Sequence, residues 1–389
     1  MSENIRHPFL RLSDTNQPYR DQLVKAAIRV IDSGTYIGGT EVSALENELA
    51  ELCKTRHAVC VSNGLDALRL ILKAYIEMGM LRYGDHVIVP DMTFVATALA
   101  VSDCGLVPVT VDVSLSTCNL DSMLVEQAIS PRTRAIIPVH LYGRVCCDDH
   151  LIALVRKHNL IMIEDAAQAI GAESTIPGLN GTHSAGSLGH AAAFSFYPTK
   201  NIGALGDAGA VVTNDSALAE TIRTLANYGY RGSYNSVLQG YNCRMDSIQA
   251  AMLRVKLPHT DEENLYRRAQ AAEYSRLIDN PFIIKPAPAN DKAHIYYQYV
   301  ILVCNPDDRS IQNYALRERF RKHMLANGIE TGVHYPQPIH SQPCFPELND
   351  LELPVSTMIA DSVVSLPIGR TTSLADISDI ANAVNSFKP

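Results

Sequence analysis

Short apolar runs alternate with longer amphipathic stretches through the first half of the chain. Seven continuous runs predict strands: Ala58–Ser62, His86–Pro90, Val107–Val113, Ala135–Leu141, Ile161–Glu164, Ala191–Phe196 and Gly209–Thr213. The stretches between them predict helices: Asp66–Met80, Thr93–Ser102, Ser122–Ala128, Asp148–Lys157 and Ser216–Leu225. Because the apolar runs are continuous, we expect strands buried on both faces of a largely parallel sheet. The alternation therefore predicts an α/β domain.

The pattern changes near Pro258. A helix predicted for Ser247–Lys256 ends before this proline, and the charged stretch Asp261–Arg276 predicts a long helix leading away from the first domain. The elements expected after it are a strand, a helix, a short strand and a closing helix, at Tyr296–Val303, Tyr314–Asn327, Gly332–Tyr335 and Ala375–Phe387. The sequence thus predicts two domains, residues 1–258 and a smaller α+β domain of residues 259–389.

Composition and charge narrow the classes of partner. The net charge of -8 leaves no bulk basic field for nucleic acid. The start of the chain lacks an apolar signal segment and no apolar run could span a bilayer, so we expect a cytoplasmic protein without membrane contact. The nine cysteines are odd in number and lack a C-x-x-C pair, which indicates reduced thiols. Cys147 with His150 offers only two ligands, so no metal site is predicted.

The segment FSFYPTKNIGALGDAGA, residues 194–210, carries the most informative chemistry. A predicted strand runs into a polar turn that ends in Lys200. An amine there can face a cleft, and it becomes nucleophilic if it is desolvated or lies near another cation. Glycines 203, 206 and 209 permit close approach of the backbone to a ligand. A surface lysine in a glycine-rich loop explains the segment equally well, whereas a dinucleotide fingerprint fits worse because the glycines lead into a strand.

Asp165 and Gln168 follow the apolar strand of IMIEDAAQAIGA, residues 161–172. A carboxylate at the carboxyl end of a strand can face a ligand, and it can raise the pKa of a bound pyridine nitrogen so that this nitrogen stays protonated. The alternative is a helix N-cap, because Asp followed by Ala-Ala-Gln begins a helix well.

Two other strand ends carry ligand-binding features. The turn Ser62-Asn63-Gly64 leads into a helix near Asp66, and a helix N-terminus preceded by glycine is a ready phosphate site, although ordinary turn chemistry explains it too. Phe94 lies just past the next strand, where it could stack on a flat ring, although a lone Phe is more often a core residue. In chain order, a phosphate turn, a stacking aromatic, an Asp and a Lys supply what pyridoxal phosphate (PLP) requires of a protein.

From about Gly34 to beyond Gln342 the chain resembles the DegT/DnrJ/EryC1/StrS sugar aminotransferases. The motifs that carry the resemblance are SNGLDAL, PDMTFVATA, PVHLYG, IEDAAQAIGA, FSFYPTKNIGALGDAGAVVTND, GYNCRMDSIQAA and HYPQPIH. The resemblance implies an aspartate aminotransferase-like α/β fold (PLP fold type I). That fold has a large domain with a seven-stranded mostly parallel sheet and a small C-terminal α+β domain. It also implies PLP as the cofactor.

The resemblance further implies roles for single residues. Lys200 would carry the cofactor as a Schiff base and shuttle a proton, and Asp165 would pair with the pyridine nitrogen. The other implied cofactor contacts are Gln168 at the ring hydroxyl, Phe94 on the ring, Gly64, Leu65, Asp66 and Ser195 at the phosphate, and Asn242 at the phosphate of a neighbouring subunit. The implied sugar-pocket positions are Tyr36, Tyr142, His334 and Tyr335.

The implied activity is transfer of an amino group from L-glutamate to a keto nucleotide-sugar, in a homodimer with shared active sites. The wording YPTKNIGALGDAGA, ANYG and GYNCRMD is most similar to members acting on 3-keto sugars, which favours a dTDP-3-keto-6-deoxyhexose. A C4 aminotransferase of a dTDP- or UDP-4-keto-6-deoxyhexose and a non-catalytic regulator on the same fold stay open as alternatives. Lys200 speaks against the dehydratase branch of the family, which carries histidine there.

Overall fold

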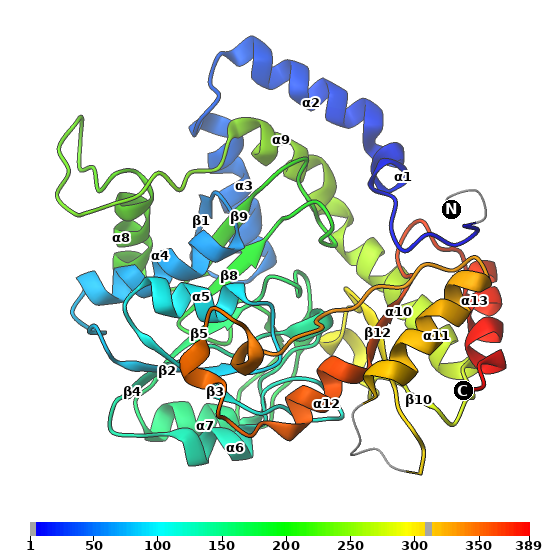
Figure 1. Cartoon of the computed structure of the whole chain (residues 1–389). Coiled ribbons are helices and arrows are strands. Elements are labelled where there is room, and N and C mark those ends of the chain that lie inside the picture. Colours follow the sequence, from blue (N-terminus) through cyan, green and yellow to red (C-terminus); the bar gives the residue numbers. More distant parts are fainter. Residues whose placement is uncertain (1–4, 308–312) are drawn as a thin grey trace.

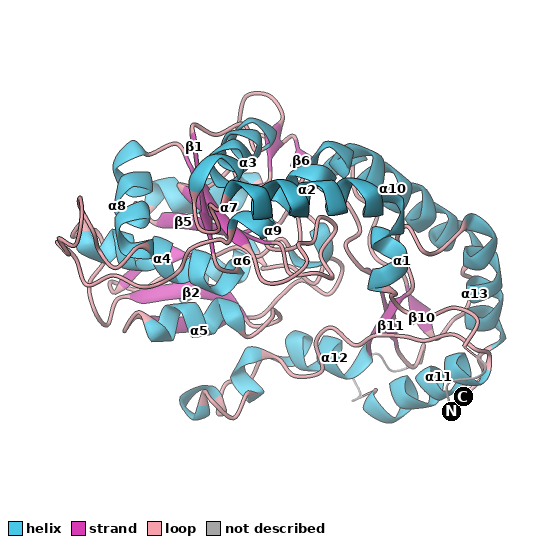
Figure 2. Ribbon diagram, turned by 90° about the horizontal axis from the view of Figure 1, so that it is seen from above, coloured by secondary structure: helices cyan, strands magenta, loops and turns pink. Residues whose placement is uncertain are grey.

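The structure is a computed structural model that describes residues 5–307 and 313–389. The chain forms two parts, each built on its own sheet (Figure 1), and a view from above places the two parts side by side (Figure 2). Within the described residues, none of the helices combines the length and apolarity needed to cross a bilayer.

The first part contains the predicted seven-stranded sheet. Its strands are β1 His57–Val61, β2 His86–Pro90, β3 Val107–Val111, β4 Thr133–Ile136, β5 Ile161–Asp165, β8 Ala191–Ser195 and β9 Gly209–Thr213. Their order is β1-β9-β8-β5-β4-β2-β3, and β9 runs antiparallel to both of its neighbours while the other pairs are parallel. The expected α/β fold with a mostly parallel sheet is therefore confirmed.

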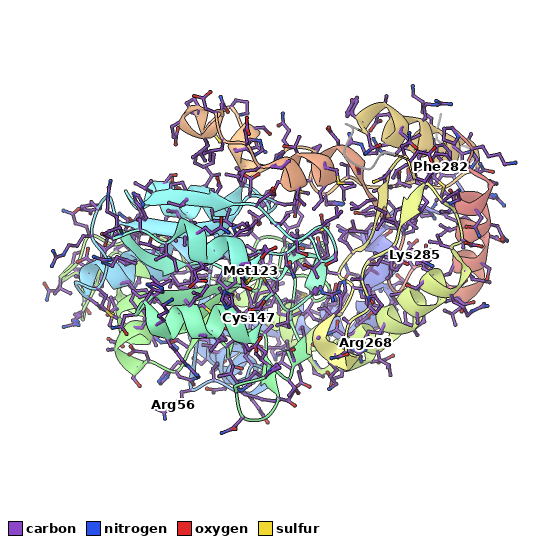
Figure 3. The ribbon with its side chains drawn as sticks, turned by 90° about the horizontal axis from the view of Figure 1, so that it is seen from below. Arg56, Met123, Cys147, Arg268, Phe282 and Lys285 are labelled. Carbon is purple, nitrogen blue, oxygen red and sulfur yellow. The ribbon has the colours of Figure 1, made fainter. Side chains whose placement is uncertain are left out.

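Helices cover both faces of this sheet, which is why the strands lack polar alternation. One face packs against α4 Gly64–Glu77, α5 Ala96–Asp103 and α8 Ser216–Ala226. The opposite face packs against α3 Gly39–Leu52, α9 Ser247–Lys256, α6 Ser122–Ala128 and α7 Asp149–Lys157. Within β1, Val59 and Val61 point to the first face and Ala58 and Cys60 to the second. Met123 of α6 and the nearby Cys147 lie on this second face, seen from below in Figure 3.

The second part is a three-stranded antiparallel sheet with helices around it. Its strands are β10 Ile283–Ile284, β11 Tyr299–Val303 and β12 Val363–Leu366, and its helices are α10 Thr260–Leu277, α11 Tyr314–Ala326, α12 Pro354–Ser362 and α13 Leu374–Ser386. The start of the chain also lies here, because the N–H groups of Arg6 and His7 donate to the carbonyl of Gly328. The predicted boundary at residue 258 falls in the 3-10 turn Leu257–His259, and it stays a prediction.

Several elements differ from those expected. Helix α2 Arg20–Ser33 was not anticipated, and the short strand expected at Gly332–Tyr335 is reduced to one bridge between Gly332 and Ser365, because prolines follow and end the pairing. The apolar run Ala135–Leu141 is a strand only to Ile136.

The smaller elements are α1 Leu12–Asn16, β6 Glu173–Ser174, β7 His183–Ser184 and the 3-10 turns Gln17–Tyr19, Leu141–Gly143, Leu257–His259, Asp291–Ala293, Ile339–Ser341 and Pro346–Leu348.

Candidate active site

A cavity of about 530 Å³ lies at the carboxyl ends of β5 and β8, and residues of both parts line it. This is where ligands of parallel sheets bind. Nine of the predicted site residues line it: Gly64, Leu65, Phe94, Asp165, Gln168, Ser195, Lys200, His334 and Tyr335. We call it the main cavity.

Two neighbouring acids at the end of β5 differ in how their oxygens are used. Glu164 is fully buried and accepts four hydrogen bonds, from the N–H groups of Gly186, Leu188 and Gly189 and from His140 Nε2. Asp165 lines the main cavity and, among the described residues, its carboxylate accepts only from the hydroxyl of Thr97, at 2.8 Å, and the N–H of Ala167, at 3.2 Å. Burial raises the pKa of the Asp165 carboxyl above its ordinary value, while these hydrogen bonds oppose the shift. The protein thus supplies the hydrogen bonds that the Glu164 carboxylate needs, whereas the Asp165 carboxylate can still accept one from a cationic ligand.

Lys200 lies in the loop after β8, and its ammonium sits 4.6 Å from the centre of the Tyr297 ring. The loop is held from behind: Asn201 donates to Asn264 of α10, and the same Asn264 donates to the carbonyl of Ile170 after β5. Lys256 donates to the carbonyl of Gly203 in the same loop. Helices α9 and α10 therefore fix the position of Lys200 relative to the Asp165 strand.

The start of α4 forms another wall of the main cavity. Asn63 caps the helix by accepting from the N–H of Asp66, and the Asp66 carboxylate is bound by Ser62, Asn63 and Arg69. The backbones approach so closely that a Cβ on Gly64 would lie 2.8 Å from the Cβ of Ser195. Gly64 and Leu65 line the cavity at the helix N-terminus, a position that favours an anion.

The second part supplies the opposite wall. The phenol of Tyr335 accepts from Gln168 Nε2 at 3.1 Å, and its ring lies 5.3 Å from that of Phe94. Burial, followed by the charge of Lys200, lowers the pKa of His334 to about 4, so this imidazole is neutral at pH 7. Uncharged rings therefore face the charged groups of the sheet edge.

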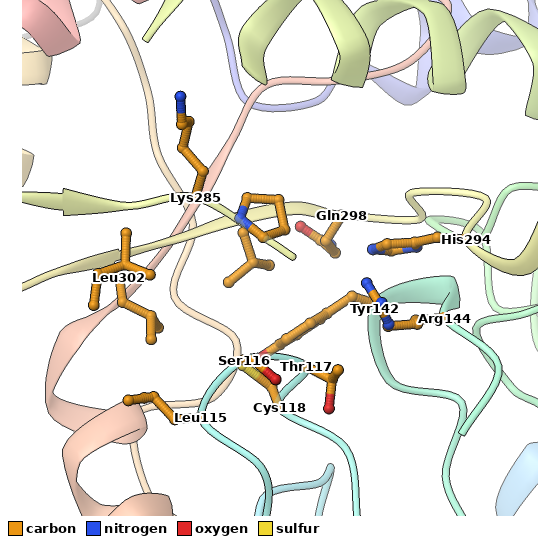
Figure 4. A pocket seen from close by; sticks show the side chains of 13 residues that line it. Leu115, Ser116, Thr117, Cys118, Tyr142, Arg144, Lys285, His294, Gln298 and Leu302 are labelled. Atoms are coloured by element: carbon orange, nitrogen blue, oxygen red, sulfur yellow. The ribbon is translucent and has the colours of Figure 1, made fainter. Parts of the chain in front are cut away.

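Four predicted site residues lie elsewhere. Tyr36 is exposed, and Asp66 and Asn242 do not line the main cavity. Tyr142 is buried in a neighbouring cavity of about 30 Å³, where Figure 4 shows it among the lining side chains, and its phenol donates to the carbonyl of His334. Tyr142 therefore acts on the main cavity through the backbone of His334.

Among the site residues missed in the sequence, Tyr297 contacts Lys200 and Thr97 contacts Asp165. Tyr297 lies within the predicted strand Tyr296–Val303 and beneath Lys200, but a tyrosine near the start of an apolar run gives no signal of that position. Thr97, which binds Asp165, lies four residues after Thr93, so one helical turn between two threonines was the available signal. No group of three or more His, Cys, Asp or Glu side chains that could hold a metal occurs in the part of the chain described.

Residues 18–385 match the DegT/DnrJ/EryC1/StrS aminotransferase family. The dTDP-3-amino-3,6-dideoxy-alpha-D-galactopyranose transaminase of Aneurinibacillus thermoaerophilus is 42% identical over 98% of this chain and 99% of its own. The erythromycin biosynthesis sensory transduction protein EryC1 of Saccharopolyspora erythraea is 44% identical over 93% and 94%. The solved structure of DesV from S. venezuelae superposes with a TM-score of 0.88 at 41% identity, covering 98% of both chains. The chain therefore belongs to the DegT/DnrJ/EryC1/StrS aminotransferase family.

Proposed function

We propose that the protein is a cytoplasmic PLP-dependent aminotransferase that transfers an amino group from L-glutamate to a keto nucleotide-sugar. The observation that carries the proposal is that Lys200 and Asp165 line one cavity together with the start of α4. A regulator would need a cavity to bind a ligand, but it would need neither a nucleophilic amine nor a buried carboxylate beside it.

The residues of the main cavity fit PLP. The N–H groups at the start of α4 and the hydroxyl of Ser195 suit a phosphate, and Gly64 is required there because a Cβ at this position would lie 2.8 Å from the Cβ of Ser195. Asp165, whose pKa is raised by burial, suits a protonated ring nitrogen because the cation would offset the cost of burying the carboxylate. Phe94 would cover one face of the ring.

The bound cofactor would supply a reactive carbonyl and an electron-withdrawing ring. Lys200 would attach it through Nζ and, once released, would carry a proton on that nitrogen between donor and cofactor carbons. Asp165 would hold the proton on the ring nitrogen, and Gln168, fixed by Tyr335 and by the N–H of Tyr142, would orient the ring. The neutral His334 and Tyr335 would exclude water from the sugar side without adding charge.

The proposed sugar substrate is a dTDP-3-keto-6-deoxyhexose, giving a dTDP-3-amino-3,6-dideoxyhexose. Support comes from the Aneurinibacillus relative, which is named for a dTDP-3-amino-3,6-dideoxy sugar and matches nearly the whole chain. A nucleotide diphosphate remote from the reacting carbon provides binding energy that orients the sugar.

The test uses the PLP-loaded protein and its visible absorption band. A dTDP-3-amino-3,6-dideoxyhexose and a dTDP-4-amino-4,6-dideoxyhexose are added separately. We expect the 3-amino sugar alone to remove the band. Loss with the 4-amino sugar alone would make the protein a C4 enzyme, and a protein that takes up no PLP would overturn the proposal.

We also propose a homodimer with shared active sites. Tyr36 and Asn242 lie outside their own chain's main cavity, and α2 presents apolar side chains outward, with Ile28 51% and Ile31 61% exposed. A contiguous apolar face of this kind marks an interaction surface. Ile28→Glu should produce a monomer in sedimentation and lower the affinity for PLP. Lys25→Glu, on the same helix, is the control and should leave the dimer intact. A wild-type protein that sediments as a monomer would refute the homodimer.

A further inference from the structure

A second, smaller chamber adjoins the main cavity. It has a volume of about 160 Å³ and shares Thr199, Tyr297 and His334 with the main cavity. We call it the side chamber. Its volume is below the roughly 300 Å³ at which pockets for whole small-molecule ligands begin, so it suits one arm of a ligand.

A buried arginine borders the side chamber without a carboxylate partner. Arg267 of α10 is 8% exposed, and among the described residues no acid lies within 4 Å of its guanidinium. Its Nη1 lies 3.3–3.4 Å from the carbonyls of Tyr296, Tyr297 and Ile368, and its Nε has no hydrogen-bond partner in the described chain. Glu263, one turn earlier, is bound by Tyr19 and Arg370 instead. An anion bound beside Arg267 would offset the cost of burying this guanidinium without a carboxylate partner.

The other polar groups of the side chamber suit a carboxylate. The hydroxyl of Thr199 lies 3.3 Å from the Tyr297 phenol, and Gln298 also lines the chamber. Gln298 is 6% exposed, and its Nε2 is the carboxamide atom that can donate to a carboxylate. A guanidinium fork with a carboxamide and a hydroxyl matches the two oxygens of a carboxylate. Leu10 and Ile368 close the chamber with apolar surface, which leaves no room for a nucleoside diphosphate.

We propose that the side chamber is a subsite that binds a carboxylate of the amino-acid donor. Tyr297 lines both spaces: Lys200 sits over its ring, and the hydroxyl of Thr199 lies 3.3 Å from its phenol. A donor with its amino group at Lys200 could extend a carboxylate past Tyr297 to Arg267. The inference rests on the proposed function, because a transaminase needs a place for an acidic donor.

The decisive variant is Gln298→Glu, which places a carboxylate on a residue that lines the side chamber and also the small cavity beside Tyr142 (Figure 4). It should pair with Arg267 and fold normally, and it should repel the donor. We expect the KM for L-glutamate in the amino-donor half-reaction of the PLP-loaded enzyme to rise roughly tenfold to a hundredfold relative to that for the amino sugar, as for loss of a charged hydrogen bond. Arg268→Gln, which removes the neighbouring arginine on α10 (Figure 3), is the matched control and should leave this ratio unchanged.

The choice of donor distinguishes the two carboxylates. If L-glutamine, which lacks the distal charge, is unaffected by Gln298→Glu, the distal carboxylate occupies the chamber; if glutamine is affected equally, the α-carboxylate does. An unchanged KM for both donors would overturn the subsite, as would an equal loss of the donor and sugar half-reactions.

Binding of glutarate provides a readout that needs no turnover. Glutarate should raise the melting temperature of the wild-type holoenzyme but not that of Gln298→Glu or Arg267→Gln. If the wild type reacts with no amino acid, the proposed function fails by itself, and the glutarate shift still decides on the subsite. Equal shifts in the wild type and Gln298→Glu would refute it.

Discussion

The two walls of the main cavity are built in different ways. The sheet-edge wall takes Asp165, Ser195 and Lys200 from the ends of adjacent strands, and α4 begins beside them. The small-part wall takes Tyr297, His334 and Tyr335 from loops around a three-stranded sheet. The first wall carries the charged groups and the second carries neutral rings. The contrast indicates that the sheet edge performs the chemistry, while the loops shape the space and adjust its polarity.

The largest effect should come from Lys200→Ala on the sheet-edge wall. Removal of the amine removes both the attachment point and the proton carrier, so we expect kcat to fall by about 10⁴-fold or more. The protein should stay colourless after incubation with PLP while its far-UV circular dichroism is unchanged. Lys322→Ala, an exposed lysine of α11, should remain yellow and active. Retained activity in Lys200→Ala would show that the sheet-edge wall does not carry the catalytic residue.

Within the sheet-edge wall, we expect Asp165 to serve ligand binding and its neighbour Glu164 to stabilise the fold. Asp165→Asn should keep the fold and lower kcat by roughly 10²–10⁴-fold, because the ring nitrogen loses the charge that holds its proton. Glu164→Gln should instead cost about 3 kcal/mol of unfolding free energy, because a donor replaces an acceptor of backbone N–H groups and His140. Urea titrations and steady-state rates of both variants test the contrast. The reverse pattern would contradict it.

The small-part wall should respond to acid. The pKa of His334 is lowered from 6.5 to about 4, so the unfolded chain binds a proton here that the folded chain rejects. The unfolding free energy is therefore unaffected by protonation of His334 above pH 6.5. It falls by up to about 3 kcal/mol as the pH is lowered from 6.5 to 4. His334→Asn should lose less stability than the wild type over this window in urea unfolding at several pH values. Parallel pH profiles would show that His334 is protonated freely in the folded state.

The smallest effect should come from Tyr142→Phe. The change removes only the phenol that donates to the carbonyl of His334, so it should cost about 1 kcal/mol of stability and raise the KM for the nucleotide sugar by only a few-fold. A large rise in this KM with unchanged stability would mean that Tyr142 contacts the sugar directly, as the family resemblance implies.

The sheet-edge wall could be predicted because its determinants are local. Continuous apolar runs identify buried parallel strands, and the carboxyl ends of such strands meet at one edge. Asp165 follows such a run directly and Lys200 ends the short turn after another, so their meeting required only the strand order. The bounds of β2, β9, α6 and α9 match the predicted ones for the same reason.

The small-part wall and the side chamber were decided by tertiary structure. Arg267 and Arg268 are adjacent in a charged helix, and the sequence gives them the same chemistry. Burial separates them, because α10 turns Arg267 toward Tyr297 and Ile368 while Arg268 stays partly exposed. The sequence alone determined the strands of the seven-stranded sheet, their polar ends and the family to which the chain belongs. Which cation is desolvated, and therefore available to hold an anion, depends on contacts between residues about 30 and 100 positions apart in the chain.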